Sequence, residues 1–123
     1  MCPHNAAKSV LAMAYARQYA DKHPDQALSF VSAGTEPGKT HSPAVVTYLG
    51  ENNLALPALA PRQVSQSDLD EADLVISMGC DLSEYELPTE KMQEWSALTD
   101  TDVDLETAVS EISSKVEKLL TDL

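Results

Sequence analysis

The first nine residues hold the side chains best suited to chemistry. Cys2 is followed by five loop residues, then by Lys8, Ser9 and a predicted helix. A loop that enters a helix N-terminus directs several unpaired N–H groups, and the positive end of the helix dipole, toward one point. The same field lowers a cysteine pKa from about 8.5 toward the reactive range of about 3.5 to 7.5. The spacing therefore predicts a tetrahedral oxyanion held over a cysteine nucleophile.

Two side chains just after the loop would strengthen such a site. Lys8 would add a full positive charge, and the Ser9 hydroxyl would donate either to the sulfur or to the bound anion. The predicted oxyanion-binding set consists of the loop and its cation: His4, Asn5, Ala6, Ala7 and Lys8.

The elements that must position this loop alternate between helices and strands. Residues 5–22 have helical spacing of apolar residues, and His23-Pro24 ends the pattern. Residues 73–78 form a nearly continuous apolar run, typical of a strand buried on both faces of a parallel sheet. The other predicted elements are a strand at 28–32, a helix at 44–52 after Ser42-Pro43, a short acidic helix from Ser65 or Ser67 to 72, and a short edge strand at 92–95.

The final helix has the clearest pattern. Asp104 is its expected N-cap, and one apolar stripe runs along about 19 residues. Two to three heptads are short for a coiled coil, so docking on a sheet is the better interpretation. The alternation of elements predicts one α/β domain over residues 1–123, with a small parallel sheet flanked by helices. The stripe consists of Leu105, Val109, Ile112, Val116, Leu119 and Leu123.

Composition excludes several classes of partner. The chain has 123 residues with 20 acidic against 8 basic side chains, a net charge of −12, which argues against nucleic acid or an anionic membrane as partner. No apolar span approaches the roughly 20 residues of a transmembrane helix, and no signal pattern opens the chain. Two cysteines fit a reducing cytosol, so a cytoplasmic location is expected. The three histidines and two cysteines lack metal-ligand spacing, so we predict no metal.

Four segments in chain order carry a family resemblance. They are Cys2-x5-Lys8-Ser9, Ser-Ala-Gly-Thr-Glu-Pro at 32–37, Pro-Arg-Gln at 61–63 and Glu-Ala-Asp-Leu-Val-Ile-Ser-Met at 71–78. Together they resemble the low-molecular-weight protein tyrosine phosphatase superfamily, most closely its thiol-dependent arsenate reductase branch. The resemblance spans roughly residues 2–112 and implies a three-layer phosphatase-I-like fold with a P-loop.

The resemblance also implies roles for particular residues. In that family a loop cysteine attacks the oxyanion, a loop asparagine holds the backbone shape, and an aspartate on a late loop is the general acid. These roles would fall on Cys2, Asn5 and Asp100, with Asp102 as the alternative acid. Trp95 matches the tryptophan segment that precedes the acid loop.

Two departures from the family pattern bear on the substrate. Lys8 stands where most members carry arginine, and a lysine ammonium cannot grip two oxygens with a planar fork. The loop at 99–102 lacks the aromatic pair that phosphatases place against a phosphotyrosine ring. Both features favour a small oxyanion such as arsenate over a phosphotyrosine substrate.

The redox relay of the thioredoxin-linked members is incomplete. Cys80 resembles the first of their two further cysteines, but Leu87-Pro88 stands where the second is expected. Either Cys80 resolves Cys2 directly, or an external thiol such as glutathione, mycothiol or a redoxin completes the reaction. We favour the external thiol as co-substrate, which requires no bound cofactor; Cys80 then has an ordinary buried role.

The family also has a buried strand before the nucleophile, whereas here only Met1 precedes Cys2. A truncated record is the leading explanation; a partner chain or rearrangement that fills the gap, and a degenerate inactive protein, are the alternatives. The predicted function is arsenate reduction in an arsenical-resistance role. Its alternatives are a protein tyrosine or phosphomonoester phosphatase and an inactive oxyanion-binding homologue. The oligomeric state is left open, with a dimer among the options.

Overall fold

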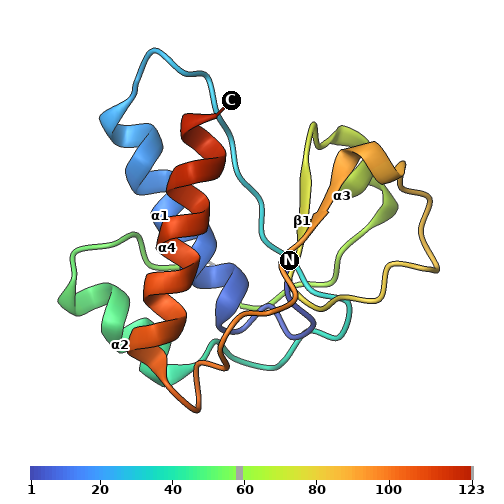
Figure 1. Ribbon diagram of the computed structural model, residues 1–123. Coiled ribbons are helices and arrows are strands. Elements are labelled where there is room, and N and C mark those ends of the chain that lie inside the picture. The colour runs from blue at the N-terminus through green and yellow to red at the C-terminus, as the bar shows by residue number, and fades with distance from the viewer. Residues whose placement is uncertain (58–59, 123) are drawn as a thin grey trace.

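The computed structural model describes residues 1–57 and 60–122 (Figure 1). Helices α1, α2 and α4 lie together on one side of the molecule, and the short sheet lies with α3 on the other. This confirms the predicted α/β class with a small parallel sheet. In chain order the elements are α1 (Lys8–Lys22), α2 (Pro43–Glu51), α3 (Gln66–Glu71), β1 (Val75–Ser77), the 3-10 helix η1 (Thr89–Lys91), β2 (Met92–Glu94) and α4 (Leu105–Thr121).

The sheet contains two parallel strands. β1 pairs with β2 so that Val75 lies opposite Met92 and Ser77 opposite Glu94. The predicted strands at 73–78 and 92–95 are therefore confirmed with shorter limits. On the other edge of β1, the Met1 ammonium donates to the Ile76 carbonyl at 2.6 Å.

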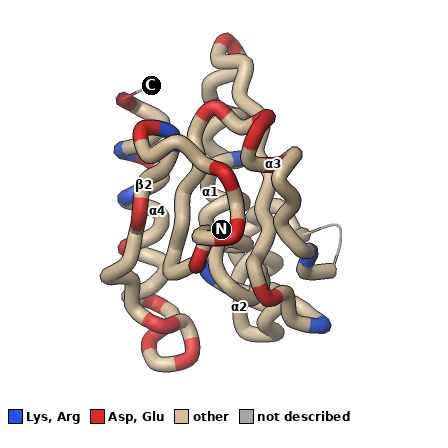
Figure 2. The backbone as a smooth tube through the Cα atoms, turned by 90° about the vertical axis from the view of Figure 1, so that its right-hand side faces the viewer, with Lys and Arg blue, Asp and Glu red and all other residues tan. Residues whose placement is uncertain are grey.

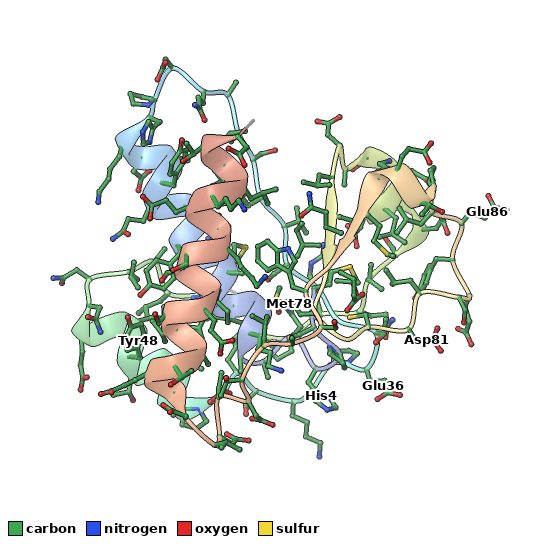
Figure 3. All side chains as sticks on the ribbon, viewed as in Figure 1. His4, Glu36, Tyr48, Met78, Asp81 and Glu86 are labelled. Carbon is green, nitrogen blue, oxygen red and sulfur yellow. The ribbon has the colours of Figure 1, made fainter. Side chains whose placement is uncertain are left out.

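A second bond completes this N-terminal contact. The N–H of Met78 donates to the Met1 carbonyl at 2.7 Å, so Met1 makes the two backbone bonds of a parallel bridge. Met1 itself therefore ties the start of the loop to β1. Figure 3 places Met78 at the junction between the helices and the sheet.

The prediction of a strand at 28–32 is wrong. Leu28 and Phe30 pack against the helical core while Val31 is 69% exposed, so the alternation of faces is present. No strand forms there, because within the described residues no backbone on either side completes a ladder with it. The single nearby bridge joins Gly34 and Gln63. Alternation alone therefore gave the right faces but not a hydrogen-bonded strand.

The helix predictions at 5–22, 44–52 and 65–72 are confirmed within a few residues. Ser42 caps α2 with proline at its first position, and Ser65 forms a capping box with Asp68 at the start of α3. Helix α4 packs along α1. The side chains that α4 buries are Ala108, Val109, Ile112, Val116 and Leu120.

The predicted α4 stripe holds with one change. Leu120 rather than Leu119 is fully buried, because a helix drifts relative to a strict seven-residue repeat. Leu105 and Leu119 pack partly against the core, and Leu123 lies outside the described residues. The expected cap is also present: the N–H of Thr107 donates to an Asp104 carboxylate oxygen at 3.1 Å. Among the described helices, none is long and apolar enough to cross a bilayer.

Candidate active site

The loop between Met1 and α1 buries its cysteine among hydrogen-bond donors. Cys2 is 6% exposed, and its Sγ lies 3.1 Å from the Ser9 hydroxyl and 3.4 Å from the Ser9 N–H. Burial alone would raise the pKa of Cys2. The bonds from Ser9, the nearby Met1 ammonium and the N–H of Ala7 outweigh that effect, so the pKa lies below its ordinary value. The site therefore stabilises a thiolate at residue 2.

Asn5 holds this arrangement together. It is 2% exposed and has a φ of 49°, in the left-handed region that asparagine tolerates better than most residues. Its side-chain amide donates to the Ser9 hydroxyl oxygen at 2.8 Å, and its side-chain carbonyl accepts from the Arg62 N–H at 3.1 Å. Because Ser9 Oγ accepts from Asn5, its own proton is free to point at the Cys2 sulfur. The chain of bonds runs from Arg62 to the thiolate.

Backbone bonds turn the loop carbonyls outward. The carbonyl of Pro3 accepts from the N–H of Glu36 at 2.7 Å, that of His4 from Gly38 at 3.0 Å, and that of Ala6 from Ser42 at 2.8 Å. The segment at 36–42 thus holds these three carbonyls, while the N–H of Asn5 donates to the Cys2 carbonyl at 3.3 Å. Oriented N–H groups are what a loop needs to bind an oxyanion.

Two histidine bonds and one glycine hold the loop against residues 34–41. His4 shares a 2.9 Å hydrogen bond with the Glu36 carbonyl, and Figure 3 shows the two residues side by side at the edge of the molecule. The ring of His41 donates to the Asn5 carbonyl at 3.0 Å. A Cβ on Gly34 would collide with the Pro3 carbonyl, so only glycine lets this segment pass so close.

Lys8 begins α1 and is half-buried beside the loop. Within the described part of the chain it forms no ion pair, unlike Arg62, whose guanidinium pairs with Asp68 at 2.9 Å. A lysine at a helix N-terminus opposes the helix dipole, which costs stability unless an anion is bound there. Its position therefore suits the predicted anion contact, which stays a prediction.

Asp100 lies in the acidic loop that precedes α4 (Figure 2). Its carboxylate accepts from the Asp102 N–H at 2.9 Å, and its carbonyl accepts from the N–H groups of Val103 and Asp104 at 3.1 Å. Among the described residues no hydrogen bond links Asp100 or Asp102 to the Cys2 loop. The structure thus brings Cys2, Asn5 and Ser9 together, whereas the acid role of Asp100 stays a prediction.

Cys80 follows β1 and is partly buried. Its N–H donates to the Ser77 hydroxyl at 3.2 Å. Burial raises the pKa of Cys80; the Met1 ammonium and hydrogen bonds with Thr35 oppose that effect without reversing it. The two thiols therefore differ in kind: Cys2 is poised as thiolate and Cys80 as thiol. Across the described residues, no group of three or more possible metal-ligating side chains gathers.

Sequence reasoning missed three contributors to the site. The Met1 ammonium acts on the cysteine through its charge, and the backbone of Arg62 and the ring of His41 both bond to Asn5. All three lie outside the Cys-x5-Lys-Ser pattern. The Arg62 N–H lies in a motif used for the resemblance, but nothing in its residue type signals a backbone donor. The contacts of Met1 and His41 depend on the fold alone.

The geometry defines a class: an α/β protein with a cysteine at the base of an oxyanion-type loop that opens a helix. Residues 1–100 match the family model described as low molecular weight phosphotyrosine protein phosphatase. The chain therefore belongs to that family.

Relatives from both branches of the family resemble the chain. A Halobacterium salinarum protein provisionally named arsenate reductase is 30% identical over 124 residues, covering 100% of this chain and 87% of that protein. The Archaeoglobus fulgidus arsenate reductase structure is 28% identical with a TM-score of 0.78, covering 98% of this chain and 95% of that one. The structure of a low molecular weight protein tyrosine phosphatase from T. tengcongensis has a TM-score of 0.80 at 21% identity. The match covers 99% of this chain and 95% of that one, and at this identity it shows the shared fold alone.

A longer structure also shares the fold. The thioredoxin-dependent arsenate reductase of Corynebacterium glutamicum has a TM-score of 0.83 at 24% identity. The match covers 98% of this chain, which spans only 58% of the length of that structure.

Proposed function

We propose that this protein is an arsenate reductase in which Cys2 is the nucleophile and an external thiol supplies the electrons. The observation that carries the proposal is the bond chain from Asn5 through Ser9 to the Cys2 sulfur, with distances of 2.8 and 3.1 Å. It supplies a stabilised thiolate at the start of a loop whose carbonyls are turned outward. The arsenate reductase names of two relatives support the choice of substrate.

The first step forms a bond between sulfur and arsenic. The Cys2 thiolate attacks arsenate held by the loop amides and the Lys8 ammonium. One arsenate oxygen leaves as water after protonation, with Asp100 as the proposed proton donor. The product is a Cys2 adduct of arsenic in the +5 state.

The second step transfers two electrons. The sulfur of an external thiol attacks the Cys2 sulfur, and the electron pair of the S–As bond passes to arsenic, which leaves as arsenite in the +3 state. Cys2 is left in a mixed disulfide, and a second thiol releases it while the two external sulfurs join as a disulfide. Arsenate and two thiols thus give arsenite, one disulfide and water.

Lys8 favours this substrate over a phosphotyrosine. A compact ammonium contributes charge without the bidentate fork that arginine gives to an in-line phosphoryl transfer. Phosphomonoester hydrolysis is the second candidate, because the family model is that of phosphotyrosine phosphatases. It would use the same Cys2 nucleophile, with water rather than a thiol attacking the covalent intermediate.

The test measures both reactions on one preparation. Arsenate turnover is followed by NADPH oxidation through glutathione and glutathione reductase, through mycothiol with its reductase, or through a redoxin with its reductase; phosphatase activity is followed with p-nitrophenyl phosphate. We expect thiol-dependent arsenate turnover that Cys2→Ser lowers by at least about a thousandfold. Cys80→Ser is the matched control and should retain turnover with the external thiol.

Each other result rejects part of the proposal. Loss of arsenate turnover in both variants would make Cys80 the resolving thiol. Hydrolysis of p-nitrophenyl phosphate without arsenate turnover would assign the phosphatase reaction. Absence of both activities, with isothermal calorimetry still detecting phosphate binding, would make the protein an inactive oxyanion-binding homologue.

A further inference from the structure

Four successive carbonyls of the oxyanion loop, those of residues 3–6, are held by the segment that leads into α2. Three of them accept from backbone N–H groups of residues 36–42, and the fourth, at Asn5, accepts from the ring of His41 at 3.0 Å. A side-chain substitution other than proline leaves the three backbone donors in place. The bond at Asn5 is therefore the one in this set that the residue type controls.

The bond from His41 fixes the direction of a whole peptide group. The Asn5 carbonyl and the Ala6 N–H belong to one trans peptide unit, which is planar, so the two groups point in opposite directions. While His41 holds the carbonyl, the N–H of Ala6 points away from His41. Within the described residues, that N–H donates to no backbone carbonyl. It is thus an oriented donor that a ligand could use.

The next peptide group shows what such an orientation achieves. The Ala6 carbonyl accepts from the Ser42 N–H at 2.8 Å, and the other end of the same peptide group is the N–H of Ala7. A hydrogen bond from that N–H is one of the causes that lower the pKa of Cys2. A carbonyl held by the segment before α2 is therefore coupled to an N–H on the side of the thiolate.

We propose that His41 is a positioning residue, whose ring holds the Asn5–Ala6 peptide group so that the Ala6 N–H faces a bound oxyanion. Without this bond, rotation of one peptide group would exchange the N–H for a carbonyl oxygen, which repels an anion. His41 acts through Asn5 and is not itself a catalytic residue. The inference rests on the oxyanion site of the proposed function, but on no part of its redox chemistry.

The start of α2 presents the His41 ring from a restrained backbone. His41 is half-buried and directly precedes Ser42, which caps α2, and Pro43, which is its first residue. A proline restricts the backbone of the residue before it, so the chain that carries the ring has little freedom. In Figure 1 this segment runs below the first turn of α1. Such rigidity is what a positioning contact requires.

The test measures oxyanion binding directly, with inorganic phosphate as the probe and titration calorimetry on the whole protein. Leucine and asparagine have the same branched shape, but only asparagine carries an N–H donor where histidine has Nδ1. We expect His41→Leu to weaken phosphate binding about tenfold and His41→Asn to stay within about threefold of the native protein. Because asparagine is uncharged, this rescue would separate the hydrogen bond from any charge on the ring.

Alkylation of Cys2 by iodoacetamide separates positioning from collapse of the loop. The hydrogen bonds that lower the pKa of Cys2 come from Ser9 and Ala7. His41→Leu leaves both donors in place, so the alkylation rate at neutral pH should change by less than about twofold. A collapsed loop would instead lose phosphate binding and the reactive thiolate together.

The Ala6 amide can also be observed by itself, by nuclear magnetic resonance of isotope-labelled protein. Phosphate should move the amide proton resonance of Ala6 downfield, and at saturating phosphate this shift should be smaller in His41→Leu. The Ala7 resonance is the internal reference, because the carbonyl of its peptide group is held by the backbone of Ser42. It should shift equally in the native protein and the variant.

His23 provides the matched control. Its Nδ1 also bonds to a backbone carbonyl, that of Tyr19 at 2.8 Å, and it is also half-buried. It lies at the end of α1, at the opposite end of that helix from the loop. His23→Leu removes the same kind of bond and should leave phosphate binding unchanged.

Several outcomes would overturn the proposal. They are no phosphate binding by the native protein, unchanged binding in His41→Leu, equal weakening by His23→Leu, an equal loss in His41→Asn, and slowed alkylation of Cys2 in parallel. If His41→Leu fails to fold, His41→Asn decides: a native melting temperature with weakened phosphate binding contradicts the proposal, and native binding supports it. Phosphate binding that depends on His41 without arsenate turnover would reject the proposed reduction and keep this inference.

Discussion

Cys2 is buried and Cys80 is partly buried, yet the pKa values of their thiols shift in opposite directions. Burial raises the pKa of each, but only at Cys2 do hydrogen-bond donors reverse the effect. The net charge of −12 disfavours a thiolate at either site. The contrast shows that local N–H and O–H groups, rather than the overall charge, decide which cysteine is reactive.

The donors at Cys2 depend on a single scaffold residue. Asn5 fixes Ser9 against the sulfur and accepts from the Arg62 backbone, whereas Cys80 bonds to Ser77 and Thr35. Among the variants that test the difference between the two thiols, we therefore expect the largest effect at Asn5 and the smallest at Cys80.

Asn5→Ala should have the largest effect among the scaffold variants. It removes two buried hydrogen bonds and releases Ser9, so we expect a loss of about a hundredfold in kcat/KM for arsenate. The Arg62 N–H left without an acceptor, and the Ser9 oxygen left without its donor, should also lower the free energy of unfolding by about 1–3 kcal/mol. Steady-state kinetics and urea unfolding measure the two effects.

The chain offers a matched control for Asn5. Asn53 also has a positive φ, of 56°, but lies after α2 and is exposed. Asn53→Ala should cost about 1–2 kcal/mol in stability through the same backbone strain and leave kcat/KM unchanged. A comparable loss of activity in both variants would mean that strain and not the Ser9 bond explains the effect of Asn5→Ala.

Lys8→Ala should have the next largest effect. Removal of the ammonium beside the loop should raise the KM for arsenate about tenfold, because a hydrogen bond to a charged group contributes about 1.5–3 kcal/mol. Lys22, in the last turn of the same helix, is the control, and Lys22→Ala should leave KM unchanged. An unchanged KM in Lys8→Ala would remove Lys8 from the oxyanion site.

Ser9→Ala tests the donor at the sulfur itself. The thiolate is the species that iodoacetamide alkylates, and a lowered pKa means that Cys2 reaches its maximal rate at a lower pH than Cys80. Without the Ser9 hydroxyl, the pKa of Cys2 should rise and its alkylation at neutral pH should slow about fivefold to tenfold. Peptide mass spectrometry resolves the two cysteines. An unchanged rate would assign the low pKa to the Met1 ammonium.

Local patterns were enough to predict most of the fold. The α4 stripe, the Ser42-Pro43 start of α2 and the apolar run of β1 are each specified by residues near in sequence. The strand at 28–32 failed for a reason that no local pattern contains. A strand exists only where another backbone completes its hydrogen bonds, and that partner lies far away in sequence.

In the site, too, contacts between residues near in sequence could be predicted, and contacts between distant residues could not. The grouping of Cys2, Asn5 and Ser9 could be predicted from their spacing, because the loop and the first turn of α1 are contiguous in the chain. The bond from His41 to Asn5 joins residues 36 positions apart, and the Met1 bonds to β1 join residues more than 70 apart. These contacts depend on tertiary packing, so a residue pattern could not predict them.

Cys80→Ser should have the smallest effect and is the sharpest test of the comparison. The Cys80 side chain is a neutral thiol at neutral pH because burial raises its pKa, and its backbone bond to Ser77 survives the substitution. With saturating glutathione, mycothiol or redoxin, kcat should change by less than about twofold, since electrons arrive from outside the chain. A dependence on external thiol that becomes steeper in Cys80→Ser would show that Cys80 shares the resolving step. Mass spectrometry of the stalled enzyme decides the point: a Cys2–Cys80 disulfide in the native chain contradicts the external-thiol route, whereas a mixed disulfide on Cys2 supports it.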